Sequence, residues 1–299
     1  MLSELDRLGT EGVNERTKLI DRMSTIEFLE IMNEEDKQVI EAVNKVIPSI
    51  AKLVDYIIDS FKKNGRLIYI GAGTSGRLGI LDAVECPPTF GTDPSKVVGL
   101  IAGGENAFVQ AVEGAEDNYS LGKEDLKSIR LTENDIVIGL SASGRTPYVM
   151  GALEYATEIG TVTGSICCNE DSKISKLATV PIELLTGPEV LTGSTRLKAG
   201  SAQKMTLNML STGAMKGIGK IYKNLMVDLK PTNLKLIERA KGIIMKATDV
   251  AYEEAEEFLE ASNNNPKIAI VMIKNKCSYE EAQRDLENNS GILYKAIEN

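Results

Sequence analysis

Two loops rich in glycine and hydroxyl side chains are the first residues whose types and spacing could do chemistry. Gly71-Ala-Gly-Thr-Ser-Gly76 follows one short apolar run, and Ser141-Ala-Ser-Gly-Arg-Thr146 follows another and precedes Pro147. Glycine lets the backbone approach an anion, and the first turn of the following helix offers unpaired N–H groups. One such loop can be no more than a capped helix start. Two of them, each at the carboxyl end of a strand in one sheet, predict a phosphate site.

The first loop also matches the GxGxxG pattern of dinucleotide-binding proteins, but this match is weak. Such proteins place an acidic ribose ligand at the end of the second strand, about 20 residues further on. Here the second strand starts near Lys96 and ends at Ala102-Gly103-Gly104. A dinucleotide oxidoreductase and a tight strand-to-helix turn without a ligand both stay open as alternatives for this loop.

A third polar stretch, Thr192–Gly200, precedes an apolar helical pattern and adds positive charge. Its only cations are Arg196 and Lys198, which could neutralise an anionic substrate, and Ser194 and Thr195 are candidate ligands beside them. The alternative is an exposed basic helix start. The helix dipole disfavours cations at that end, which favours a functional role for them.

The sequence contains no histidine. A Ser-His-Asp triad, a Cys-His pair and a histidine-ligated zinc are therefore excluded. Proton transfer would fall to Glu, Asp, Lys or Tyr, and carboxylates are the first candidates. Glu85 is one of them, because it lies where the helical pattern after the first loop reaches the rigid pair Pro87-Pro88.

Glu116 is the second candidate carboxylate. A helix predicted over about Glu105–Tyr119 places Glu116 on one stripe with Val109 and Val112. A carboxylate on an apolar stripe loses hydration, which raises its pKa and suits acid–base catalysis. A partly buried, salt-bridged glutamate at the edge of the stripe is an equally good interpretation of the pattern.

The composition of the chain disfavours several classes of protein. The 299 residues carry 34 Lys and Arg against 43 Asp and Glu, a formal net charge of −9, which disfavours a nucleic-acid binder. No apolar run approaches the roughly 20 residues that span a bilayer, and no signal-peptide pattern opens the chain. The four cysteines form no CxxC pair, so zinc ribbons and disulfide scaffolds are disfavoured. We expect a cytoplasmic protein without a metal or cofactor, with no nucleic-acid or membrane partner.

Five short apolar runs alternate with helical patterns and must position these loops. Near-continuous apolar strands between helices are typical of a parallel sheet covered on both faces. We therefore predict a doubly wound α/β domain over residues 50–230, with ligands at the carboxyl ends of its strands. The predicted strands are Arg66–Gly71, Val97–Ile101, Asp135–Leu140, Val162–Cys168 and Thr179–Leu185.

Helical segments flank this domain on both sides. Residues 1–49 form a predicted N-terminal arm with helices, in which residues 1–22 are extended and a helix begins after Ser24. A second helix is predicted from about Asn33 to Lys63, with Pro48 as a candidate kink. Residues 231–299 predict a small all-helical subdomain, with helices over 233–247, 249–261, 266–275 and 278–288.

Taken in order, these motifs resemble those of the N-acetylmuramic acid 6-phosphate etherases, a family with a sugar isomerase (SIS) domain. Besides the two loops, the resemblance rests on Asp82–Gly91, Glu113–Asp117 and Gly193–Gly200, and it covers nearly the whole chain. The predicted C-terminal helices resemble the family's ubiquitin-associated-like (UBA-like) subdomain. One departure lies in the N-terminal arm, where Val13 and Glu15 replace the Arg and Pro of the family's Arg-Asn-Pro.

The resemblance implies a lyase that cleaves the lactyl ether of N-acetylmuramic acid 6-phosphate during cell-wall recycling. The products are N-acetylglucosamine 6-phosphate and D-lactate. By resemblance, Glu85 aligns with the proton donor to the leaving lactate, and Glu116 with the second carboxylate of the site. A homodimer is also implied.

The same resemblance assigns the hydroxyl groups of the two loops to substrate binding. Ser141, Ser143 and Thr146 are expected to hold the phosphate, and Thr74 and Ser75 are expected nearer the sugar. The alternative from another class is a non-catalytic phosphosugar sensor, since related modules serve in regulators. The chain has both carboxylates and no DNA-binding segment ahead of the α/β domain, which favours the enzyme.

Overall fold

The computed structural model describes residues 8–110, 112–231 and 233–297, and it divides into two compact units. The first unit comprises the chain up to residue 83 together with residues 95–211. The second comprises residues 84–94 together with residues 212–299. The second unit begins inside the long helix α10 (Lys198–Gly217) and includes the end of α5 (Gly73–Phe90). The domain boundaries expected at residues 49 and 230 stay predictions.

The first unit is built on a five-stranded parallel sheet in the order β2-β1-β3-β4-β5, which confirms the predicted doubly wound topology. Gly71 pairs with both Ile101 and Leu140, so the first three strands end at the same edge. The loops that follow them therefore begin side by side, as the sequence predicts. The strands are β1 (Leu67–Gly71), β2 (Val97–Ile101), β3 (Ile136–Leu140), β4 (Val162–Cys167) and β5 (Val180–Glu183).

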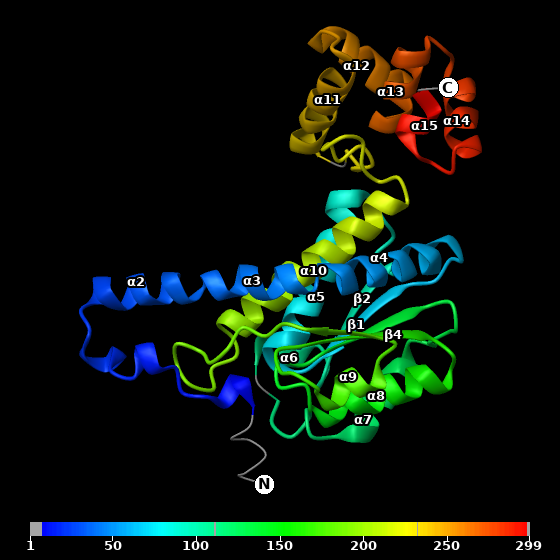
Figure 1. Cartoon of the computed structure of the whole chain (residues 1–299). Helices are drawn as coiled ribbons and strands as arrows, with labels where there is room; N and C mark the ends of the chain where they lie inside the picture. The colour runs from blue at the N-terminus through cyan, green and yellow to red at the C-terminus, as the bar shows by residue number, and fades with distance from the viewer. Residues whose placement is uncertain (1–7, 111, 232, 298–299) are drawn as a thin grey trace. The chain divides into compact units, whose positions relative to one another are not determined.

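Helices cover both faces of this sheet (Figure 1). On one face, Ile68, Ile70 and Val137 pack against a group of helices that follow the strands. On the other face, Tyr69 donates its hydroxyl to Asp82 of α5 at 3.0 Å. Side chains alternate between the faces, and both faces are buried, which explains the near-continuous apolar strands. The helices of the first face are α7 (Tyr119–Ser128), α8 (Pro147–Glu158) and α9 (Lys173–Leu177).

The N-terminal region departs from the prediction of an extended arm and one long helix. Residues 8–22 contain three short 3-10 turns, at Gly9–Glu11, Glu15–Thr17 and Ile20–Arg22. Three helices follow, α2 (Thr25–Glu35), α3 (Lys37–Lys45) and α4 (Ile47–Lys62). Ser24 caps α2 in a reciprocal capping box with Glu27, as its position in the sequence suggests. Pro48 belongs to the first turn of α4, where a missing N–H costs nothing, instead of kinking a longer helix.

A second departure lies between β2 and α7. The predicted helix over residues 105–119 is wrong. Among the described residues of this range, only α6 (Asn106–Val109) and Tyr119, which begins α7, are helical, and turns occupy residues 113–117. Helix α6 ends where Gln110 adopts an extended backbone, and Gly114, with a φ of +76°, lies in the turns that follow. Val109 is 82% exposed, so no buried apolar stripe forms there.

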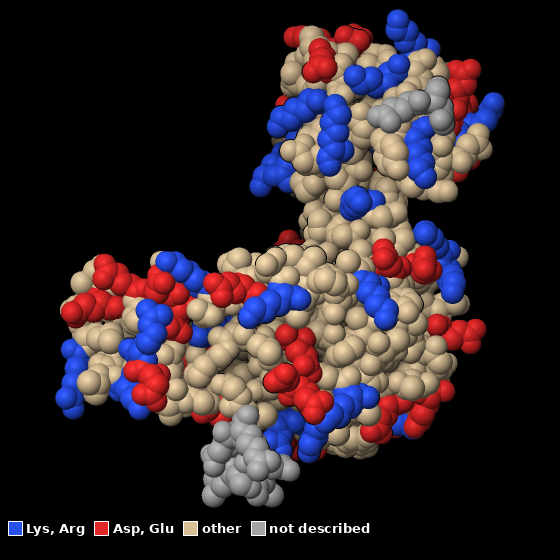
Figure 2. Space-filling view, in the orientation of Figure 1, with Lys and Arg blue, Asp and Glu red and all other residues tan. Residues whose placement is uncertain are grey.

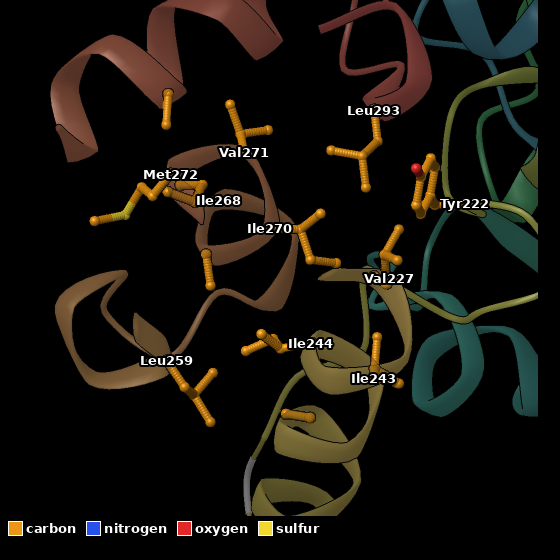
Figure 3. Packing of buried hydrophobic residues seen from close by; sticks show 14 of the residues in the cluster. Tyr222, Val227, Ile243, Ile244, Leu259, Ile268, Ile270, Val271, Met272 and Leu293 are labelled. Carbon is orange, nitrogen blue, oxygen red and sulfur yellow. The ribbon is translucent and has the colours of Figure 1, made fainter. Parts of the chain in front are cut away.

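The second unit has its own hydrophobic core around α13 (Pro266–Asn275). Ile268, Ile270 and Val271 point toward neighbours that include Ile244 and Leu293 (Figure 3). Four of its helices confirm the predicted pattern, and a fifth short helix was not predicted. The other helices are α11 (Leu234–Thr248), α12 (Tyr252–Ala261), α14 (Tyr279–Asn288) and α15 (Leu293–Ile297).

The surface carries both signs of charge. On the face shown in Figure 2, Lys and Arg side chains lie among Asp and Glu side chains in each unit. This distribution agrees with a chain in which acidic residues outnumber basic ones by 43 to 34. Within the described residues, no helix is both long and apolar enough to cross a membrane.

Candidate functional site

The loop after β3 orders itself through its own hydroxyl groups. Ser141 is buried, and its Oγ lies 2.8 Å from Thr146 Oγ1 and 3.2 Å from Ser143 Oγ. The N–H of Gly144 donates to the same oxygen at 3.1 Å. Ser141 therefore holds the loop together from within, whereas Ser143 and Thr146 are only half-buried and present hydroxyls at the surface.

The loop is held against the rest of the sheet edge at Gly144. This residue has a φ of +72°, and a Cβ there would lie 2.4 Å from Ser172 Cβ. The side-chain amide of Asn169 donates to the carbonyl groups of Ala142, at 3.1 Å, and Ser143, at 3.3 Å. The loop leads directly into α8, whose Thr146 N-cap makes no side-chain capping bond. Pro147, the first residue of α8, has no N–H, and the N–H of Val149 donates to the carbonyl of Thr146 at 3.1 Å. An anion at this loop would therefore bind to the hydroxyls of Ser143 and Thr146 beside the positive end of the helix dipole.

A cavity of about 280 Å³ and another of about 440 Å³ meet at Glu116. The larger one brings Glu116 together with Ser143 and Thr146, and it also contains the side chains of Arg145 and Lys173. The smaller one brings Glu116 to Gly73, at the start of α5, and to Arg77. A carboxylate and an anion-binding loop thus share one space.

Glu116 reaches this place by a route that the sequence did not predict. It lies in a turn and is exposed, so the expected desolvation on an apolar stripe is absent. Its carbonyl oxygen accepts the N–H of Tyr148 at 3.0 Å, which fixes the turn to the first turn of α8. The backbone of α8, the helix that follows the phosphate-type loop, therefore holds Glu116 in place.

The two cations beside the loop were missed by the sequence reasoning. Arg145 lies inside the loop motif, and Lys173 is the first residue of α9, just after β4. The position of Lys173 at the carboxyl edge of the sheet is the signal that could have identified it. Both can neutralise the charge of an anion held at Ser143 and Thr146.

The first loop presents one of its two predicted hydroxyls to a cavity. Thr74 lines a space of about 420 Å³ together with Arg196 and Lys204. Ser75 is buried and donates its hydroxyl to Gln203 Oε1 at 2.9 Å. Thr74 is thus the accessible ligand of this loop, and Ser75 ties the first turn of α5 to α10.

The third polar stretch divides in the same way. Ser194 and Thr195 are half-buried, and Arg196 is exposed in the cavity with Thr74. Lys198, by contrast, is the first residue of α10, and its side chain is 1% exposed and paired with Glu35, with Nζ 2.8 Å from Oε2. A direct contact between Lys198 and a substrate would require this buried ion pair to break.

Glu85 lies on an exposed part of α5 that belongs to the second compact unit. The helix does not end at the expected Pro-Pro pair, since it continues through Pro87 and Pro88 to Phe90. One turn before Glu85, Asp82 is buried and accepts hydrogen bonds from Tyr69, at 3.0 Å, and Ser211, at 3.2 Å. Burial raises the pKa of Asp82, although these hydrogen bonds oppose the shift.

Comparison with family models matches two overlapping parts of the chain. The SIS domain model matches residues 119–213. The model of the glucokinase regulatory protein N-terminal SIS domain matches residues 49–157. Both matches include the loop after β3, on which the phosphate prediction depends.

Comparison with whole proteins gives much longer matches. The chain is 59% identical over 293 residues to N-acetylmuramic acid 6-phosphate etherase of Halalkalibacterium halodurans, covering 98% of each chain. It is also 59% identical to the etherase of Bacillus cytotoxicus, covering 98% of this chain and all of that one. A phosphoheptose isomerase structure from Francisella tularensis matches with a TM-score of 0.50 and 16% identity, over 65% of this chain and all of that one. This last match supports the fold alone.

Proposed function

Because this chain belongs to the N-acetylmuramic acid 6-phosphate etherase family, we propose that it cleaves the D-lactyl ether of N-acetylmuramic acid 6-phosphate. One observation supports the loop after β3 as the place where this reaction would occur. The cavity of about 440 Å³ holds the carboxylate of Glu116 beside the hydroxyls of Ser143 and Thr146. The substrate needs both an anion site and a proton-transfer group, and this cavity offers both.

The phosphate is held at the loop after β3. Ser143 and Thr146 donate their hydroxyls, and the positive end of the α8 helix dipole lies beside them. Arg145 and Lys173 balance the remaining charge of the phosphate. Ser141 keeps the loop in this shape without touching the substrate, since its oxygen is already bonded inside the loop.

The sugar reacts in its open-chain form, in which the C1 aldehyde acidifies the proton on C2. Glu116 removes that proton, and Glu85 donates a proton to the ether oxygen on C3. The C3–O bond breaks with its electron pair on oxygen, so D-lactate leaves and a C2=C3 double bond forms beside the aldehyde. Water then adds to C3 as C2 regains a proton, which gives N-acetylglucosamine 6-phosphate. Carboxylates perform every proton transfer in this sequence of steps.

We also propose that the protein forms a homodimer, in which a second copy of the chain covers the surface around Glu85. Glu85 is exposed on α5 near Leu81, which is 37% exposed, and Val84, which is 57% exposed. Exposed apolar side chains that flank a functional carboxylate suit a surface covered by a second copy of the chain. We place the enzyme in the cytoplasm, where it would act in the recycling of cell-wall sugars. A purely sensory SIS module is not favoured, because the near-full-length relatives carry an enzyme's name.

The test is the Glu85→Gln variant, which keeps the shape of the side chain and removes the proton. We expect lactate release to fall at least about 10³-fold, near the upper part of what general acid catalysis contributes. Binding of N-acetylglucosamine 6-phosphate, measured by calorimetry, should change little. Glu116→Gln should behave similarly, and Glu133→Gln, at an exposed position that lines neither cavity, is the matched control with near-normal turnover. Normal lactate release by Glu85→Gln would remove Glu85 from the mechanism.

A further inference from the structure

A cluster of buried charges lies behind the third polar stretch, outside the cavities described above. Lys198 and Glu35 pair with side chains that are 1% and 6% exposed. Glu35 Oε2 also accepts a hydrogen bond from Asn14 at 2.7 Å, and Oε1 accepts one from Arg16 at 2.9 Å. Burial alone would raise the pKa of Glu35, but the hydrogen bonds from Lys198 and Asn14 outweigh it and leave that pKa below its ordinary value.

A second buried carboxylate, that of Glu189, lies at the start of the loop that contains the predicted ligands Ser194, Thr195 and Arg196. Glu189 is completely buried, and its two oxygens accept the backbone N–H groups of Lys198, at 3.0 Å, and Ala199, at 2.9 Å. These are the first N–H groups of α10, which have no acceptor within the helix. Glu189 therefore joins the two ends of the segment that contains Ser194 and Arg196.

The N-terminal arm runs along the same segment and fastens it from outside. Thr17 donates its hydroxyl to the carbonyl of Val190 at 2.9 Å. At Gly193, where φ is +77°, a Cβ would lie 3.3 Å from a carboxylate oxygen of Glu11. The part of the arm that departs from the family pattern is thus the part that packs on this loop.

The loop between Glu189 and α10 has turns of its own but few buried side chains. Its internal backbone bonds include those from Ser194 N–H to Leu191 O, at 2.9 Å, and from Thr195 N–H to Gly193 O, at 3.0 Å. Leu191 is 55% exposed, and Arg196 is exposed as well. These turns fix the local shape of the loop, and its position on the first unit depends on what holds its two ends.

We propose that Glu35, Lys198 and Glu189 form a clamp that positions Ser194, Thr195 and Arg196 for the phosphosugar. The proposal rests on the proposed function and adds that Lys198 is a positioning residue instead of a substrate ligand. Well-packed apolar residues can replace a buried ion pair without loss of stability, so stability alone does not require charges at these positions. What the buried charges add is a fixed geometry, because Glu189 accepts the first two N–H groups of α10 and Glu35 holds the side chain of Lys198.

The test compares Lys198→Met with the double variant Lys198→Met/Glu35→Gln. The single variant leaves Glu35 buried without its ammonium partner, and its thermal midpoint should fall clearly. The double variant removes both charges, and its midpoint should return close to the wild-type value. The clamp predicts that KM for the phosphosugar stays raised about tenfold in the double variant, with kcat within about threefold of wild type. Recovery of a wild-type KM together with the midpoint would overturn the proposal.

Two further measurements separate positioning from direct binding. If Lys198 bound the substrate directly, Glu35→Gln alone would free its ammonium group and leave KM unchanged or lower. If Lys198 positions the loop, the same variant should raise KM. Arg196→Ala should raise KM in the wild-type background and add little in the Lys198→Met/Glu35→Gln background, since the loop is already misplaced there. If Arg196→Ala raised KM by the same factor in both backgrounds, the clamp would be contradicted.

The proposed function can fail separately from the clamp. Calorimetric titration with N-acetylglucosamine 6-phosphate reports the binding effect of each variant without turnover. Absence of lactate release by the wild-type protein would overturn the proposed reaction and leave the binding comparison intact. Equal affinities of the wild-type and double-variant proteins for this phosphosugar would overturn the clamp, whatever the reaction.

Discussion

The loop after β3 and the loop before α10 both offer hydroxyl groups to the same substrate, but they are ordered in different ways. Residues 141–146 are held by bonds among themselves, with Ser141 at the centre and Gly144 packed against Ser172. Residues 191–196 are held at their ends by buried charges from α2 and from Glu189. The first loop combines its internal bonds with neutral contacts from Asn169 and Ser172, whereas the second depends on a buried charge from Glu35, which lies 163 residues away along the chain.

This difference assigns different tasks to the two loops. A locally ordered loop is rigid and suits the phosphate, whose geometry is the same in every phosphosugar. A loop that depends on distant contacts can be adjusted by changes elsewhere in the chain, such as those in the N-terminal arm. We therefore expect the first loop to supply most of the affinity and the second to direct the sugar.

The largest effect is expected from removing the surface hydroxyls of the first loop. Ser143→Ala/Thr146→Val deletes two hydrogen bonds to a charged phosphate, at about 1.5–3 kcal/mol each, so affinity should fall roughly 100-fold or more. The matched variant of the second loop, Ser194→Ala/Thr195→Val, should lower affinity only about tenfold. Calorimetry with N-acetylglucosamine 6-phosphate measures both. Equal losses would erase the proposed division between the loops.

Glycine substitutions test the same comparison through stability. Gly144→Ala places a side chain in the left-handed region and 2.4 Å from Ser172 Cβ. The free energy of unfolding should fall by about 3 kcal/mol, from the backbone strain and the overlap together. Gly193→Ala meets only the flexible end of Glu11 at 3.3 Å, so its cost should be the backbone strain of about 1 kcal/mol. Denaturant titration of both variants measures the difference, and a larger loss for Gly193→Ala would reverse the comparison.

The same distinction explains which features the sequence could predict. The strands, their parallel pairing in one sheet and the helix that begins after Ser24 depend on neighbours in the sequence or on apolar periodicity, and they were predicted well. The helix over residues 105–119 was wrong because the backbone becomes extended at Gln110, and the exposed Val109 shows that the weak periodic pattern buries no face there. Periodicity indicates which residues share a face, but it does not show whether that face is covered.

Side-chain environments were harder to predict than elements. Lys198 was expected to meet an anion, and the structure pairs it with Glu35, which lies 163 residues away along the chain. Nothing in the local sequence distinguishes a cation that awaits a substrate from one already paired by a distant helix. Lys173, which lines the cavity with Ser143 and Thr146, was not predicted, because a single lysine that follows a strand belongs to no recognisable motif.

The smallest expected effect concerns the acid dependence of the second loop. The pKa of Glu35 in the folded protein lies below its ordinary value of 4.5, because its hydrogen bonds outweigh the cost of burial. A lowered carboxyl pKa contributes stability above the unfolded value, and this contribution is lost as the pH falls through the folded value. The wild-type protein should therefore lose stability as the pH falls below the ordinary glutamate value.

Lys198→Met/Glu35→Gln lacks this titration, so it isolates the contribution of Glu35 from that of every other carboxylate. Thermal midpoints of both proteins, measured from about pH 6 to about pH 3, should decline more steeply for the wild type in the acidic part of that range. The wild-type curve should separate from that of the variant only as the pH approaches and passes below the ordinary glutamate value. Ser143→Ala/Thr146→Val should follow the wild-type slope, since the first loop is held by hydroxyl groups that do not titrate in this range. Parallel slopes for all three proteins would mean that the ion pair does not hold the second loop.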